Sequence, residues 1–144
     1  MRWVIASDHA GFALKERVRE WLQRKGFDVT DLGVHTPERA DYPDYGHRVG
    51  EAVGRGDFDR GVVVCGSGIG ISIAVNRHAG ARAALCHEPW SATMARAHND
   101  ANVLALGARV IGEGMAEAVL DAFIAGPFEG GRHAERVAKI DGST

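Results

Sequence analysis

A strand that ends in a cysteine and is followed by a glycine-rich loop constrains the fold of this chain more than any other feature. The run is Gly61-Val-Val-Val-Cys-Gly-Ser-Gly-Ile-Gly70, and residues 69–77 continue it in a helical pattern. Consecutive valines are typical of a strand that is covered on both faces, as in parallel sheets. The run therefore predicts a strand-to-helix corner at the carboxyl edge of a parallel sheet, where open α/β sheets bind ligands.

The same alternation of strand and helix patterns continues along most of the chain. Strands are expected at 2–7, 27–32, 62–65, 81–86 and 103–106, and helices at 12–25, 45–55, 69–77, 89–97 and 113–124. This order predicts a Rossmann-like three-layer sandwich, an α/β fold with a five-stranded parallel sheet and helices on both faces. Residues 127–140 resume a helical pattern but hold few apolar residues, so we expect this terminal helix to pack on a partner subunit.

Composition indicates one domain, residues 1–144, and excludes several classes of partner. Hydrophobic residues make up 45% of the chain and charged residues 25%, which is ordinary for a folded domain. A formal net charge of -2 gives no general attraction to nucleic acid or to anionic membranes. The apolar stretches are too short for a membrane span or a signal peptide, so we expect a cytoplasmic protein.

Four groups of polar residues are expected near the carboxyl edge of the sheet. The first is Asp8-His9, in the loop after the first strand, and an N-cap aspartate beside an exposed histidine explains it equally well. The second is the loop after Cys65, whose glycines leave room for a ligand beside free backbone N–H groups. A buried, inert cysteine is the commoner fate of a strand cysteine, but the neighbouring glycines favour a functional one.

The other two groups have structural explanations that the residues alone favour slightly. The stretch His98-Asn-Asp-x-Asn102, at the end of the fourth helix, can simply form a turn. Arg132 and Arg136 share one helical face, where they can hold one phosphate or form part of a solvated surface.

Several familiar motifs fail in this chain. The dinucleotide fingerprint would need glycine or alanine at Ile71, and no Gly-Lys-Ser/Thr completes a P-loop. The hydrolase elbow would need glycine at Cys65. The seven histidines show no metal-ligand spacing, so we predict no metal and no cofactor.

Taken together, the motifs resemble the type B ribose-5-phosphate isomerases. The resemblance follows nearly the whole chain, in order: Ser7-Asp-His-Ala-Gly11, Asp41-Tyr-Pro43, Cys65-Gly-Ser-Gly-Ile-Gly-Ile-Ser72, Ala74-x-Asn76, His98-Asn-Asp-x-Asn102, Gly107-x-Arg109 and Glu129-Gly-Gly-Arg-His133 with Arg136. It implies a metal-free aldose–ketose isomerase that interconverts ribose 5-phosphate and ribulose 5-phosphate through an enediolate. The wider family includes allose-6-phosphate and galactose-6-phosphate isomerases, so a 6-phosphohexose substrate stays open.

The resemblance also implies a role for individual residues. In the cysteine branch of the family the base is a thiolate, which corresponds here to Cys65. The other branch uses a glutamate just after the glycine loop, and this chain has no acidic residue there. His98 corresponds to the acid–base that opens the sugar ring, with Asp8 as its neighbour. Ser67 occupies a position that is often threonine, and its hydroxyl is expected to help move a proton between the substrate oxygens. The expected substrate and phosphate contacts are Asp8, His9, Gly66, Ser67, Gly68, Ile69, Gly70, Asn99, Arg109, Arg132 and Arg136. The family forms dimers with shared active sites, so we expect a homodimer, or a tetramer of such dimers, in which some of these residues come from the second subunit.

Two other classes of protein stay open at this point. A non-catalytic nucleotide- or phosphate-binding module would use the same fold and glycine loop but would leave Cys65 and His98 without a task. A redox sensor would pair Cys65 with Cys86, although cysteines on separate strands are expected to be too far apart to bond.

Overall fold

The computed structural model describes residues 1–142. At its centre is a five-stranded sheet in the order β2-β1-β3-β5-β4, in which every neighbouring pair of strands is parallel. The strands are β1 (Arg2–Ser7), β2 (Asp28–Asp31), β3 (Arg60–Cys65), β4 (Ala83–Leu85) and β5 (Val103–Gly107). The predicted parallel sheet is therefore confirmed.

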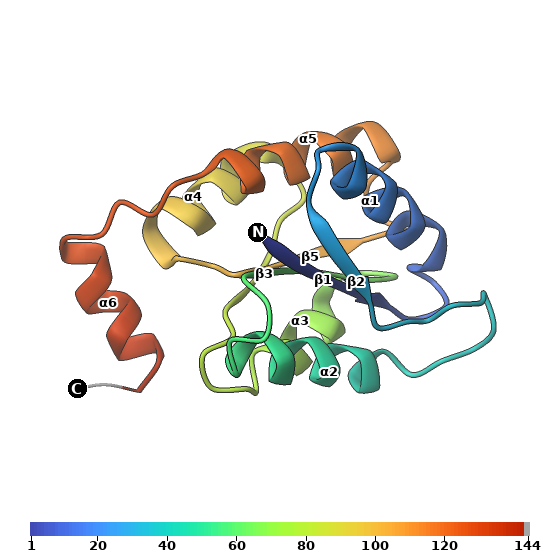
Figure 1. Cartoon of the computed structure of the whole chain (residues 1–144), viewed down its shortest axis with the longest axis horizontal. Helices are drawn as coiled ribbons and strands as arrows, with labels where there is room; N and C mark the ends of the chain where they lie inside the picture. The colour runs from blue at the N-terminus through green and yellow to red at the C-terminus, as the bar shows by residue number, and fades with distance from the viewer. Residues whose placement is uncertain (143–144) are drawn as a thin grey trace.

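Helices cover both faces of this sheet, as Figure 1 shows. One face carries α1 (Phe12–Arg24), α4 (Pro89–Asn99) and α5 (Glu113–Ala125), and the other carries α2 (Tyr42–Gly54) and α3 (Ile69–Val75). Successive residues of a strand point to opposite faces, so Trp3 and Ile5 join the first core while Val4 and Ala6 join the second. The valine-rich strands are buried because both of their faces are covered.

Several element boundaries differ from the predicted ones. α2 begins at Tyr42 rather than at residue 45, because Pro43 fits the first turn of a helix, where its missing N–H is not needed. α4 continues to Asn99, two residues beyond the predicted end, so His98 lies in its last turn. β4 is shorter than predicted, since the Arg82 N–H donates to the Asn102 side chain instead of to a neighbouring strand.

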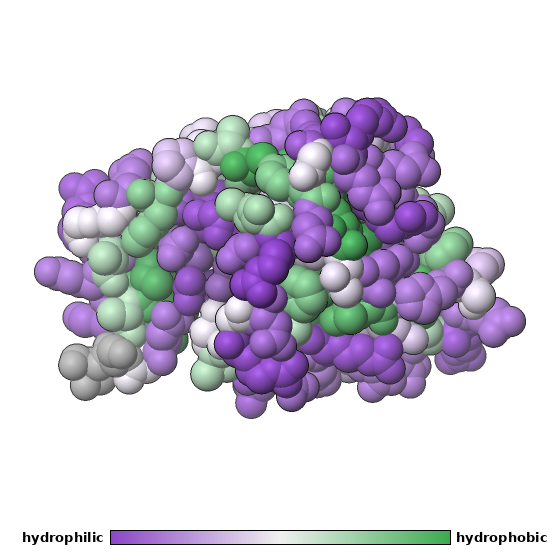
Figure 2. Space-filling view, viewed as in Figure 1, coloured by the Kyte–Doolittle hydropathy of each residue, from purple (hydrophilic) through white to green (hydrophobic). Residues whose placement is uncertain are grey.

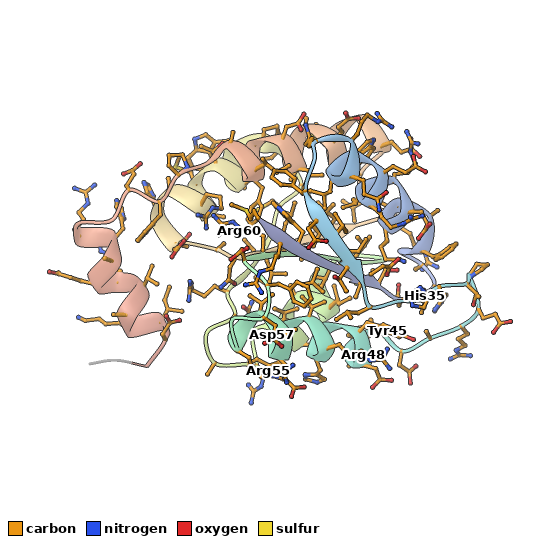
Figure 3. All side chains as sticks on the ribbon, viewed as in Figure 1. His35, Tyr45, Arg48, Arg55, Asp57 and Arg60 are labelled. Atoms are coloured by element: carbon orange, nitrogen blue, oxygen red, sulfur yellow. The ribbon has the colours of Figure 1, made fainter. Side chains whose placement is uncertain are left out.

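The strand directions separate the four candidate groups. α4 ends just before β5 begins, so the end of α4 lies at the amino edge of the sheet. In Figure 3, Arg60 at the start of β3 lies toward α6 (Arg132–Ile140), and His35, just beyond β2, lies at the opposite end. The prediction that all four groups gather at the carboxyl edge is therefore wrong for His98, Asn99, Arg132 and Arg136. A helix that connects two parallel strands returns the chain to the amino edge.

The helix α6 stands apart from the layers at one end of the molecule and contacts α4 (Figure 1). Val137 on α6 is buried, whereas Ile140 is 60% exposed, and hydrophobic atoms are visible on this helix at the left of Figure 2. Arg82 pairs with Asp141 at 3.1 Å and ties the end of α6 to the start of β4. The packing of α6 on a partner subunit stays a prediction.

No helix within residues 1–142 combines the length and the hydrophobicity that a membrane crossing requires.

Candidate active site

A cavity of about 700 Å³ opens at the carboxyl edge of the sheet, beyond the ends of β1, β3 and β5. Its lining consists of Asp8, His9, Ala10, Tyr42, Cys65, Gly66, Ser67, Ile69, Gly70, Ile73, Arg109 and Val110. This volume lies within the range typical of small-molecule sites. The structure thus brings together the first two predicted groups, the Asp8-His9 loop and the Cys65 loop, and adds Arg109.

Cys65 lies at the end of β3 with its thiol against the glycine loop. The Gly68 N–H donates to Cys65 Sγ at 3.1 Å, and the Ile69 N–H donates to Ser67 Oγ at 3.1 Å. Cys65 is therefore held as a hydrogen-bond acceptor at the cavity wall, as a base requires.

Two glycines of this loop, Gly68 and Gly70, are required by close packing. Gly68 has a φ of +76°, and a Cβ there would lie 2.6 Å from Leu85 Cδ1. A Cβ at Gly70 would overlap the Tyr42 ring. The loop thus keeps its backbone N–H groups next to Cys65 because larger residues do not fit.

The Asp8-His9 loop is fixed by hydrogen bonds to its own backbone and to a distant segment. Asp8 is 6% exposed and lines the cavity, and its Oδ1 accepts the Gly11 N–H at 3.0 Å within the loop. The N-cap of α1 is Gly11, so the interpretation of Asp8 as the N-cap is wrong. The Ala40 N–H donates to His9 Nδ1 at 3.2 Å. This bond leaves His9 Nε2 as the ring nitrogen available to a ligand.

Arg109 brings a positive charge to the same loop. Its backbone N–H donates to the Gly66 carbonyl at 2.9 Å, just as the Ala108 N–H donates to the Cys65 carbonyl at 2.9 Å. A Cβ at Gly66 would lie 3.5 Å from an Arg109 guanidinium nitrogen, so this side chain lies over the loop. An anionic substrate in the cavity therefore meets a guanidinium close to Cys65.

At the amino edge, His98 stacks on His133. The ring centroids are 4.1 Å apart and the ring planes differ by 7°. Glu129 bridges the pair, with carboxylate oxygens 3.8 Å from His98 Nε2 and 3.5 Å from His133 Nε2. Burial lowers the pKa of His133 below its ordinary value, and the neighbouring His98 and Arg132 lower it further. The charged form of His133 is therefore disfavoured in this arrangement.

These three side chains could also hold a metal, since one ligand atom from each lies within 4.8 Å of the others. The sequence spacing did not indicate this cluster. The two rings, however, are nearly parallel, so their Nε2 lone pairs lie in separate, nearly parallel planes and do not converge on one point. The positive charges of Arg132 and Arg136, which lower the pKa of His133, also oppose a cation. The geometry fits a carboxylate between two imidazoles better than a metal centre.

Comparison with known proteins identifies the family. Residues 3–140 match the model of the family described as Ribose/Galactose Isomerase. The chain belongs to this family. Ribose-5-phosphate isomerase B of Escherichia coli (strain K12) is 48% identical over 133 residues, which cover 92% of this chain and 89% of that protein.

Two further comparisons agree with this assignment to the Ribose/Galactose Isomerase family. The structure of Clostridium thermocellum ribose-5-phosphate isomerase B is 49% identical, with a TM-score of 0.97 over 99% of this chain and 96% of that one. D-erythrulose-4-phosphate isomerase of Pectobacterium atrosepticum is 43% identical over 137 residues, which cover 94% of this chain and 90% of that protein.

The amino-edge residues of this family member divide into candidate ligands and structural groups. Asn99 lines a second cavity of about 490 Å³, together with residues 76–84, 101, 140 and 141. The Asn102 side chain accepts the Arg82 N–H at 2.7 Å and donates to the Gly80 carbonyl at 2.9 Å. Asn102 is therefore a structural residue, as the turn interpretation predicted.

Four cavity residues were missed by the sequence analysis as site residues: Ala10, Tyr42, Ile73 and Val110. Tyr42, Ile73 and Val110 are 42%, 58% and 54% exposed and give the cavity a partly apolar wall. Tyr42 had a signal, since it lies in the Asp41-Tyr-Pro43 motif. Ile73 lies one helical turn beyond Ile69 on α3, a spacing that indicated the same face. Val110 had no signal except its place beside Arg109.

The two cysteines are free and differ in their surroundings. Cys65 belongs to the core between the sheet and α2–α3, and Cys86 to the core on the other face. Burial raises the pKa of Cys86 to about 11, with a smaller contribution from Glu88. The sheet separates the two thiols, which argues against a redox sensor that pairs them.

Proposed function

We propose that this chain is an aldose–ketose isomerase that interconverts D-ribose 5-phosphate and D-ribulose 5-phosphate. The observation that carries the proposal is that the Cys65 sulfur accepts a backbone N–H in a cavity that Arg109 also lines. A non-catalytic phosphate-binding module would need the glycine loop and the arginine but not a thiol in this place. The similarity to ribose-5-phosphate isomerase B of E. coli supports the same reaction.

In the proposed mechanism Cys65 is the base. Its thiolate takes the proton from C2 of the open-chain aldose, and the C1 oxygen becomes negatively charged as the C1–C2 double bond forms. Backbone N–H groups of the glycine loop stabilise this charge, and the Ser67 hydroxyl relays a proton from the C2 oxygen to the C1 oxygen. The Cys65 thiol then returns its proton to C1, which gives the ketose and restores the thiolate.

The separation of the candidate groups supports a homodimer with shared active sites. His98, Asn99, Arg132 and Arg136 lie at the amino edge, so they would reach the cavity of a second subunit rather than their own. In that assembly His98 opens the sugar ring beside Asp8, and the two exposed arginines hold the phosphate with His9. Assembly into tetramers and the cytoplasmic location stay predictions.

The proposal is tested by assaying the purified protein for conversion of ribose 5-phosphate to ribulose 5-phosphate with EDTA present. Allose 6-phosphate, galactose 6-phosphate and erythrulose 4-phosphate should be assayed in parallel, because the family and its Pectobacterium relative include such substrates. We expect the pentose phosphate to have the highest kcat/KM. A higher kcat/KM for another sugar phosphate would keep the reaction and change the substrate, and no turnover of any of them would refute the proposed function.

Replacement of Arg132 by alanine is expected to raise KM for ribose 5-phosphate by about 10- to 100-fold with little change in kcat. A charge-assisted hydrogen bond to phosphate contributes roughly 1.5–3 kcal/mol, and it acts equally on the ground state and the transition state. Steady-state kinetics checks this, with Arg55→Ala as the control, since Arg55 is an exposed arginine at the C-terminal end of α2 that pairs with Glu51 and Asp57. An unchanged KM in Arg132→Ala would remove this residue from the phosphate site.

A further inference from the structure

Lys15, in the first turn of α1, has a side chain with 0% exposure. Its Nζ donates to Asp31 Oδ2 at 2.5 Å and to Glu16 Oε1 at 3.1 Å. Lysine is almost never fully buried unless it is paired, because removing an ammonium group from water is costly. The proposed chemistry has no use for this charge, so its burial needs another explanation.

Asp31 connects Lys15 to the strand that carries the Asp8-His9 loop. Asp31 Oδ1 accepts the Gly33 N–H at 2.9 Å. The Gly33 carbonyl accepts the Ser7 N–H at 2.8 Å, and the Val34 N–H donates to the Ser7 carbonyl at 3.0 Å. These hydrogen bonds run from the buried ammonium to Ser7, the residue that directly precedes Asp8 of the cavity.

The backbone of Lys15 holds the other end of the same loop. Its N–H donates to the Gly11 carbonyl at 2.8 Å, and the Gly11 N–H donates to Asp8 Oδ1 at 3.0 Å. A Cβ at Gly11 would overlap the Val64 carbonyl, so this loop is also packed tightly against β3. Lys15 is therefore linked to residues 7–11 from both sides, through its side chain and through its backbone.

We propose that Lys15 is a positioning residue for the isomerisation, which through its ion pair with Asp31 fixes the loop that presents Asp8 and His9 to the substrate. This inference rests on the proposed function, in which Asp8 and His9 contact the sugar phosphate. Its chemical basis is that a displacement of about 1 Å in a substrate-positioning group can lower the rate by about 10²-fold.

The test uses Lys15→Met and the double variant Lys15→Met/Asp31→Asn. Lys15→Met leaves the Asp31 carboxylate without its ammonium partner, so both the melting temperature and kcat are expected to fall. The double variant removes the unpaired charge and should recover part of the melting temperature. Its kcat should remain about 10- to 100-fold below that of the wild type, because the ion pair that fixes the loop is still absent.

Val119→Ala is the control for loss of stability alone, since Val119 is fully buried on α5 and does not line the cavity. It should lower the melting temperature without lowering kcat when all variants are assayed well below their melting temperatures. Hydrogen exchange should be faster in residues 7–11 of both Lys15 variants and unchanged there in Val119→Ala.

A double variant with wild-type kcat, or a Lys15→Met variant with wild-type kcat, would show that the ion pair serves stability only. This result is distinct from failure of the proposed function, which would appear as a wild-type protein without isomerase activity.

Discussion

Replacing Cys65 with alanine is expected to lower kcat for ribose 5-phosphate by about 10²- to 10⁴-fold, the usual contribution of a general base. The side chain is small and ends at the cavity wall, where its sulfur accepts the Gly68 N–H. Its loss should therefore leave the fold and sugar-phosphate binding intact. Measurements of kcat, of melting temperature and of stabilisation by the substrate would check the three parts of this expectation.

Cys86→Ala provides the matched control, because Cys86 is the other free and buried cysteine but lies outside the cavity. Burial raises the pKa of Cys86 to about 11, so its thiol stays protonated near neutral pH and has no part in proton transfer. This variant should keep the wild-type kcat. A Cys65→Ala protein with most of its activity would reject Cys65 as the base.

Two inactive variants, Cys65→Ala and His98→Asn, are expected to recover activity when they are mixed under conditions that allow subunits to exchange. If each active site takes Cys65 from one subunit and His98 from the other, one of the two sites in a mixed dimer contains both native residues. Random exchange would then restore about a quarter of the wild-type activity, since a twofold dimer has two equivalent shared sites. Activity should be measured before and after exchange, with mass spectrometry to confirm mixed dimers.

The control for this experiment is a mixture of Cys65→Ala with Ser67→Ala. Both residues line the same cavity, so each site of the mixed dimer would contain one of the two defects. No activity should return in this mixture beyond that of the separate variants. Mixed dimers of Cys65→Ala and His98→Asn without recovered activity would refute the shared site.

The residues of the cavity could be predicted in large part because their signals are local. Asp8 directly follows β1 and Cys65 is the last residue of β3, and the carboxyl ends of parallel strands meet at one edge. The role of Arg109 came from the family resemblance alone, and its position over Gly66 became visible only in the structure. His98 was predicted at the carboxyl edge but lies at the amino edge, because α4 ends just before β5 begins, and its role stays a prediction.

The sequence by itself determined the order of strands and helices, the parallel sheet and the glycine loop beside Cys65, because hydrophobic periodicity and glycine content act over a few neighbouring residues. Only the tertiary structure decided which groups share a cavity. It placed His98 and Cys65 at opposite ends of the strands, and it buried Lys15 against Asp31, a residue that belongs to a different element. The Lys15–Asp31 pairing depends on how α1 packs on the end of β2, and no local pattern in the sequence predicts that contact.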